Sequence, residues 1–107
     1  MKINILGTEY EIIQSPDEEL NIMKNGRDGE IIYCDKIIKV VSNPYKGLTE
    51  PPKNQEEYIK RVKRHEIIHG YIYESGNYSW LNDENIIEWI SFHFPKILQS
   101  FQESEAL

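Results

Sequence analysis

Residues 65–69, His65-Glu66-Ile67-Ile68-His69, place two histidines four positions apart, with a glutamate directly after the first. On a helix, side chains four residues apart leave the same face, with Cβ atoms about 5–6 Å apart. Two imidazoles at that separation can bind one ion through Zn–N bonds of about 2.0–2.1 Å. Glu66 is rotated by roughly 100° around the axis, which keeps it outside the chelate and beside the metal. The motif predicts one zinc ion per chain, bound by His65 and His69, with Glu66 as general base.

The flanking residues predict that this motif lies on a helix that enters the core. From Asn54 onward the apolar spacing is helical, and Tyr58 and Val62 share the face of the two histidines. Beyond Arg64, apolar residues surround the helix, which is typical of a buried segment. A chance match to a five-residue pattern more often falls on an exposed helix or a loop. Because histidines and a glutamate buried without a partner would be costly, we favour the metal site.

A third metal ligand is expected, since a catalytic zinc usually has three protein ligands and a water. Glu74 is too close on the same helix to reach back. Glu84 and Glu88 lie four residues apart on a second predicted helix. Like charges at that spacing repel by about 0.2–0.5 kcal/mol, and a cation bound directly or through a histidine would remove the repulsion. An exposed acidic stripe without a ligand is the alternative interpretation.

The first half of the chain predicts a small sheet. Residues 2–14 indicate a strand pair, or one bent strand, around Gly7. Residues 30–34 and 36–41 indicate a hairpin with its turn at Asp35-Lys36. Turn signals in 16–29 and the prolines of 42–53 predict loops.

Strands followed by helices are typical of an α+β domain. We expect residues 1–107 to form one domain, with both helices on one side of an antiparallel sheet. The second helix should begin after Asn82 as N-cap and be kinked or interrupted at Pro95. Its apolar and aromatic neighbours are expected in the core: Ile86, Ile87, Ile90, Phe94, Ile97 and Phe101, together with Trp80, Trp89 and Phe92.

Composition excludes several partners. Of the 107 residues, 39% are hydrophobic and 28% charged, with no apolar run long enough for a bilayer, so no membrane partner is expected. A formal net charge of −6 argues against nucleic-acid binding, and the basic cluster at 60–64 is interpreted as a solvated helix face. The single cysteine, Cys34, and the absence of a signal-peptide pattern predict a cytoplasmic location.

His65-Glu66-x-x-His69 followed by Asp83-Glu84-Asn85-Ile86-Ile87-Glu88 resembles the gluzincin, or thermolysin-like, metallopeptidases. In that family a glutamate on the next helix is the third ligand, and a carboxylate four residues later orients a ligand histidine. The resemblance implies that Glu84 is the ligand and Glu88 the partner of His65. Asp83 replaces the family's usual Asn, and Glu88 its usual Asp. Because the gap after His69 is shorter than in the family, and its usual spacing would make Glu88 the ligand, both assignments stay open.

A second resemblance covers most of the chain. Residues 64–69 with Tyr73-Glu74-Ser75-Gly76, and 88–90 with Phe94-Pro95-Lys96-Ile97, are similar to small proteins of bacterial phages and mobile elements. These look like minimal relatives of the ImmA/IrrE zinc metallopeptidases, some of which cleave repressor proteins.

The two resemblances imply hydrolysis of a peptide bond in a peptide or protein substrate. Glu66 would take a proton from water activated by the zinc and pass it to the leaving amine. An oxyanion stabiliser is also expected, for which the candidates are Tyr71, Tyr73, Tyr78 and His93. The strand from Lys36 to Val41 is the expected wall of the substrate cleft, where an extended peptide could pair.

The alternative is a catalytically silent zinc-binding interaction protein, in which the metal staples the fold or a surface. Structural zinc sites usually have four protein ligands, often cysteines. Cys34 alone does not provide them, and Glu66 would then have no role. A degenerate peptidase that binds a partner without cutting it is a third possibility.

Overall fold

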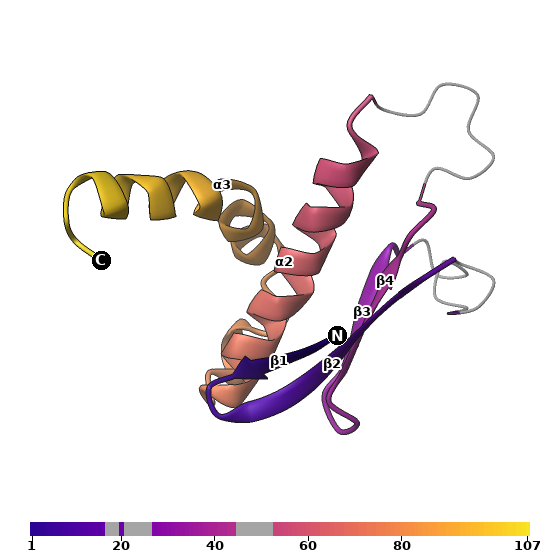
Figure 1. Ribbon diagram of the computed structural model, residues 1–107. Helices are drawn as coiled ribbons and strands as arrows, with labels where there is room; N and C mark the ends of the chain where they lie inside the picture. The colour runs from indigo at the N-terminus through magenta and orange to yellow at the C-terminus, as the bar shows by residue number, and fades with distance from the viewer. Residues whose placement is uncertain (17–19, 21–26, 45–52) are drawn as a thin grey trace.

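The computed structural model describes residues 1–16, 20, 27–44 and 53–107. Within these ranges the chain forms four strands followed by helices, which confirms the α+β class. Figure 1 shows the sheet on one side of α2 and α3 on the other. The elements are β1 (Lys2–Ile5), β2 (Thr8–Ser15), β3 (Gly29–Ile32), β4 (Ile37–Val41), α2 (Gln55–Glu74), the short 3₁₀ helix η2 (Tyr78–Trp80) and α3 (Glu84–Glu103).

The sheet is mixed, so the prediction of an antiparallel sheet is wrong. Its strand order is β1-β2-β4-β3. The two hairpins, β1–β2 and β3–β4, are antiparallel, whereas β2 and β4 run parallel, with Ile12 opposite Ile38. Alternation within each strand predicted the hairpins correctly. It carried no information on which strands become neighbours, and β2 pairs with β4 instead of with the next strand in the chain.

Two tight turns close the hairpins. Leu6 and Gly7 both have positive φ, 50° and 91°, as a two-residue hairpin turn of the I′ kind requires. The expected strand pair around Gly7 is therefore confirmed. Residues 33–36 form the turn between β3 and β4, where the hairpin was predicted. Most of the loops predicted at 16–29 and 42–53 lie outside the described residues.

The core lies between the sheet and α2. Ile5, Tyr10 and Ile38 are fully buried on the sheet, and Ile59, Val62 and Ile67 of α2 pack against this cluster. Gly70 permits the close approach, because a Cβ there would lie 2.8 Å from Cδ1 of Ile5. The packing fixes the second half of α2, and the motif on it, against the sheet.

Both helix starts are capped by side chains. Asn54 accepts a hydrogen bond from the backbone N–H of Glu57 at 3.0 Å, and α2 begins next to it, where the helical period was predicted to begin. For α3 the cap is Asp83, one residue after the predicted Asn82. The helix then continues through Pro95 to Glu103, so no interruption occurs there.

The prediction that the apolar and aromatic residues in and just before α3 lie in the core is mostly wrong. Ile87 is fully buried, as expected, but one face of α3 contacts α2 and the C-terminal half projects from the body of the molecule (Figure 1). Helical periodicity identified apolar positions but not what covers them. Six expected core residues are instead 42% to 58% exposed: Trp80, Ile86, Trp89, Phe92, Phe94 and Phe101.

Within the part of the chain that the structure describes, neither long helix is apolar enough along its length to cross a bilayer.

Candidate metal centre

Three of the predicted ligands converge between α2 and α3. His65 and His69 leave the same face of α2, and their Nε2 atoms are 3.3 Å apart. The carboxylate of Glu84, in the first turn of α3, reaches both, with Oε2 at 2.8 Å from Nε2 of His65 and Oε1 at 3.1 Å from Nε2 of His69. Ligand atoms of these residues all lie within 4.8 Å of one another, a spacing at which they could hold one metal ion.

Glu88 lies on the other side of His65. Its Oε2 is 2.8 Å from Nδ1 of His65, one turn of α3 beyond Glu84. A neutral imidazole carries one N–H and one lone pair. When Nδ1 donates to Glu88, the Nε2 lone pair of His65 points at His69 and Glu84. Glu88 therefore orients this ring, and Glu84 faces both rings.

His69 has a comparable partner on the sheet side. The hydroxyl of Tyr33, in the turn after β3, lies 3.4 Å from its Nδ1. Burial lowers the pKa of His69, an effect that the carboxylate of Glu84 opposes. The neutral ring is the form that binds metals. With Nδ1 donating to Tyr33, its Nε2 lone pair also points at Glu84.

Glu66 is buried beside this cluster. Its side chain is 8% exposed, and burial raises the pKa of its carboxyl to about 7, against the opposing charges of His65 and Arg27. Gly29 makes room for it, because a Cβ there would lie 3.1 Å from Cγ of Glu66 and 2.7 Å from Cγ1 of Val62. A carboxyl that titrates near pH 7 can both accept and release a proton at neutral pH.

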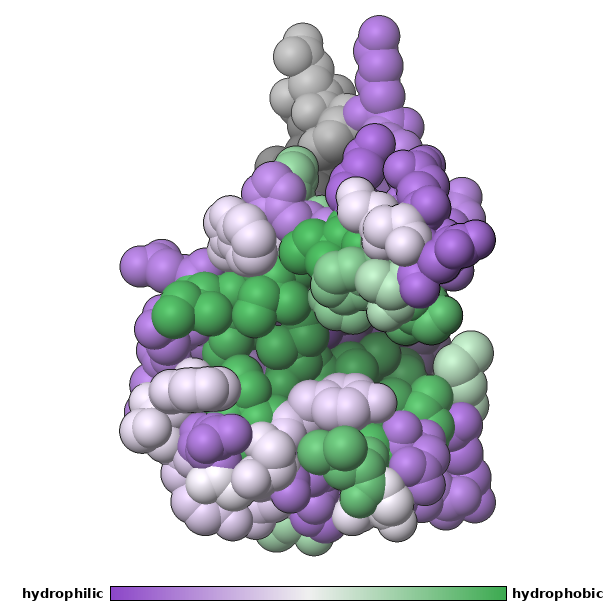
Figure 2. All heavy atoms as spheres, turned by 90° about the vertical axis from the view of Figure 1, so that its left-hand side faces the viewer, coloured by the Kyte–Doolittle hydropathy of each residue, from purple (hydrophilic) through white to green (hydrophobic). Residues whose placement is uncertain are grey.

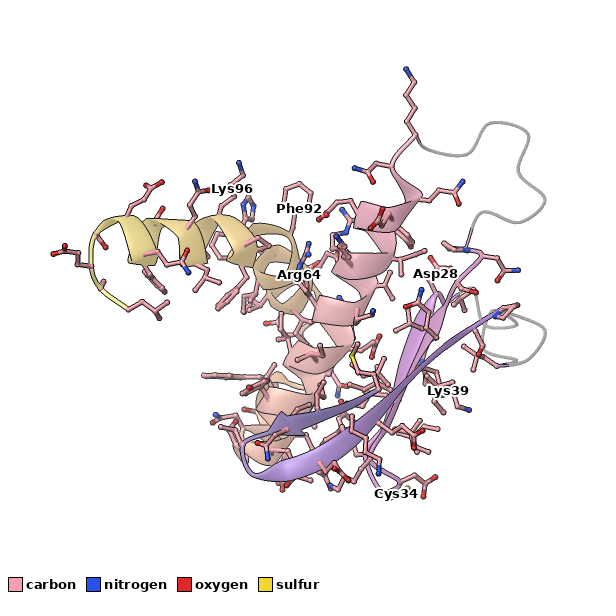
Figure 3. The ribbon with its side chains drawn as sticks, in the orientation of Figure 1. Asp28, Cys34, Lys39, Arg64, Phe92 and Lys96 are labelled. Atoms are coloured by element: carbon pink, nitrogen blue, oxygen red, sulfur yellow. The ribbon has the colours of Figure 1, made fainter. Side chains whose placement is uncertain are left out.

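Arginines of α2 hold α3 in the position that presents its glutamates. Arg61 lies 3.3 Å from Oε1 of Glu88, and Nε of Arg64 donates to the backbone carbonyl of Ser91 at 2.7 Å. Figure 3 shows Arg64 and Phe92 in the junction between the two helices. The basic cluster was interpreted as a solvated face. That interpretation fails for these two residues, which are less exposed than Lys60 and contact α3.

A pocket of about 660 Å³ opens over the cluster. One wall is β3, an edge strand. Asp28, the residue before β3, accepts a hydrogen bond from the hydroxyl of Tyr58 on α2; Figure 3 labels Asp28 beside α2. The predicted wall, the strand from Lys36 to Val41, is β4, which lies between β2 and β3 with both edges paired. It cannot receive a further strand, so this expectation is wrong. The pocket is lined by His65, Glu66, His69, Glu84 and Glu88, with Arg27, Asp28, Gly29, Glu30, Ile31 and Tyr33 among the others.

The residues that line the pocket differ from the predicted oxyanion stabilisers. Of the four oxyanion candidates, Tyr78 lines the pocket, whereas Tyr71, Tyr73 and His93 do not. Tyr33 and Arg27, which the sequence did not single out, do line it. Burial raises the pKa of Tyr33 to about 12, so its hydroxyl keeps its proton. No spacing rule links a turn residue to a helix 36 positions away, and sequence gave no signal for either residue.

Glu74 is remote from the cluster, as the sequence predicted. It accepts hydrogen bonds from Tyr10 and Lys36, both at 2.9 Å, and from Thr8 at 3.2 Å. These donors, Lys36 first, hold the pKa of Glu74 below its usual value. Glu74 therefore ties the end of α2 to the sheet.

Comparisons with protein-family models, with curated proteins and with solved structures found no match. The resemblance to zinc peptidases therefore depends on the residues quoted above.

Proposed function

We propose that this protein is a zinc-dependent metallopeptidase in which His65, His69 and Glu84 hold the ion and Glu66 is the general base. The observation that carries the proposal is the arrangement of three electron-pair donors around one point. Both Nε2 lone pairs and the Glu84 carboxylate face each other at 2.8 to 3.3 Å. One proton satisfies one of these contacts, whereas one divalent cation satisfies all three.

The donor set fits zinc. Two imidazoles and one carboxylate are the ligands of many catalytic zinc sites, with the fourth position left for water. In a tetrahedral site with bonds of about 2.0–2.1 Å, ligand atoms are about 3.3 Å apart. The two Nε2 atoms are 3.3 Å apart. When bound, zinc polarises a carbonyl and makes a water more acidic.

The residues of the chain supply the remaining chemistry. Glu66 accepts a proton from the attacking water and delivers it to the leaving amine, which suits a carboxyl whose pKa is about 7. Tyr33 and Tyr78, both lining the pocket, are the candidates to donate to the developing oxyanion. Glu88 and Tyr33 hold the two rings in place.

The edge strand β3 suits an extended peptide. β3 pairs with β4 along one edge, and residues 29–31 line the pocket along the other. A peptide that added to β3 as a further strand would run past Glu66, which packs against Gly29. The proposed substrate is therefore an extended segment of a peptide or protein.

The test is cleavage of a mixed peptide library, read by mass spectrometry of new termini. We expect cleavage within extended peptides, loss of cleavage with a zinc chelator, and recovery when zinc is restored. A protein that carries bound zinc but cleaves no peptide would overturn the proposal. The silent zinc-binding protein, which the exposed apolar residues of α3 favour, would then replace it.

Tyr33→Phe should weaken zinc binding by about tenfold. The substitution removes the hydroxyl that lies 3.4 Å from Nδ1 of His69 and leaves the ring that stacks on Tyr73 at 4.4 Å. Competition with a chromogenic chelator measures the change in zinc affinity. Tyr78→Phe, in the same pocket but 59% exposed, is the matched control. Equal affinity for wild type and Tyr33→Phe would remove Tyr33 from the site.

A further inference from the structure

A stripe of apolar side chains runs along α3. Ile86, Ile90, Phe94, Ile97 and Phe101 recur three or four residues apart and so share one side of the helix. Ile86, Phe94 and Phe101 are 54%, 44% and 42% exposed, and Ile90 and Ile97 are half-buried. We call these five residues the α3 apolar face.

The α3 apolar face has little charge. Between residues 89 and 102 the only formally charged residue is Lys96. Lys96 follows Phe92 by one turn, and Figure 3 shows both leaving the same side of α3. Phe92 lies near Arg61 of α2, with the guanidinium 5.5 Å from the ring. Trp89 packs against His93 on this same side, with ring centroids 4.8 Å apart, and so borders the α3 apolar face without belonging to it. Figure 2 shows hydrophobic side chains gathered on the side of the molecule where α3 lies, with hydrophilic ones at the edge.

The exposed area approaches what a stable dimer needs. A large aromatic side chain presents about 150–250 Å², so a half-exposed ring leaves on the order of 100 Å² uncovered. The five residues of the α3 apolar face leave roughly 350 Å², and Trp89 at their border adds on the order of 100 Å², which is within the range of the largest patch on a typical monomer. With the polar side chains along its edges, an α3 pair would approach the roughly 800 Å² per partner of standard interfaces.

We infer that two copies of the chain associate through their α3 apolar faces. A twofold axis near Phe94 would set the Ile86 end of one face against the Phe101 end of the other, and such a surface is complementary to itself. The chain's net charge is −6, so two copies repel least where acidic residues are absent. The contact also covers the projecting half of α3, whose helix needs tertiary packing for stability (Figure 1).

The proposed dimer is independent of the metal site. Glu84 and Glu88 bind the rings on α2, and neither belongs to the α3 apolar face. Metal binding and association can therefore fail separately.

Sedimentation of the full chain at up to about 100 µM tests the inference. The wild type should sediment at twice its monomer mass of 12.7 kDa. Phe101→Glu and Phe94→Glu should each raise the dimer dissociation constant at least tenfold, because each would bury an unpaired charge. Gln99→Glu, which adds the same charge outside the face, should leave it unchanged.

Circular dichroism shows whether each variant keeps its helices, and Phe101→Glu, near the end of α3, is the variant least able to disturb the core. A wild type that stays at 12.7 kDa throughout would overturn the inference, whatever other partner the face has. A dimer that persists in both glutamate variants would overturn it as well.

Discussion

Glu66→Gln should reduce peptide cleavage by about 10²–10⁴-fold and leave zinc binding intact. Glutamine has the shape of glutamate but cannot accept the proton of the attacking water. Glu66 does not belong to the cluster of His65, His69 and Glu84, so the metal affinity should change little. Cleavage rates on a peptide found in the library, with zinc content measured on the same samples, give both results.

Glu30→Gln is the matched control for this experiment. Glu30 lines the same pocket from β3, so the substitution removes the same charge without touching the proposed base. We expect its cleavage rate to stay within a few-fold of the wild type. If Glu66→Gln cleaved as fast as Glu30→Gln, Glu66 would not be the base and the peptidase mechanism would fail.

Glu66→Gln should also make the metal-free protein more stable than the wild type at alkaline pH. The pKa of Glu66 is raised from 4.5 to about 7 by burial. Below pH 4.5 the carboxyl is protonated in both the folded and unfolded states, so it has little effect on stability. As the pH rises from 4.5 to 7, the unfolded state ionises first and the fold loses stability. At pH 8 the loss is complete, about 3 kcal/mol at 1.36 kcal/mol per pKa unit.

Urea unfolding in the presence of a chelator measures this effect. We expect the free energy of unfolding of Glu66→Gln to exceed that of the wild type by about 2–3 kcal/mol at pH 8 and by a few tenths of a kcal/mol at pH 4. Glu103→Gln, which makes the same substitution at the exposed end of α3, is the matched control. If the difference in free energy of unfolding between wild type and Glu66→Gln stayed constant with pH, burial would not raise the pKa of the Glu66 carboxyl.

The sequence predicted the local elements well because local rules determine them. Gly7 and the turn signal at Asp35-Lys36 predicted the two hairpins, and the helical period from Asn54 predicted the start of α2. The mixed sheet escaped prediction because the pairing of β2 with β4 joins residues far apart in the chain. Burial along α3 also depends on contacts with distant parts of the chain. Apolar periodicity predicted that α3 is buried, but Trp89, Phe94 and Phe101 are exposed.

In the candidate site too, local spacing predicted some residues and only the packing of distant elements shows the others. Helical spacing was enough to place His65 and His69 together and to keep Glu66 apart from them. The family resemblance favoured Glu84 as the ligand but left Glu88 open as the alternative. In the structure the carboxylate of Glu84 reaches both rings, whereas that of Glu88 reaches one. Tyr33 and Gly29 come from β3 and its turn, and only the packing of β3 on α2 brings them to the site.

The most direct test of the central claim is the zinc content of the purified full chain by elemental mass spectrometry, beside that of His69→Ala, Glu84→Gln and Glu88→Gln. We predict one zinc per wild-type chain and essentially none in His69→Ala. Retention should be lower in Glu84→Gln than in Glu88→Gln, because Glu84 faces both rings and Glu88 orients one. A wild type that binds no zinc when zinc is supplied, or a His69→Ala variant that binds it as tightly, would contradict the proposed metal site.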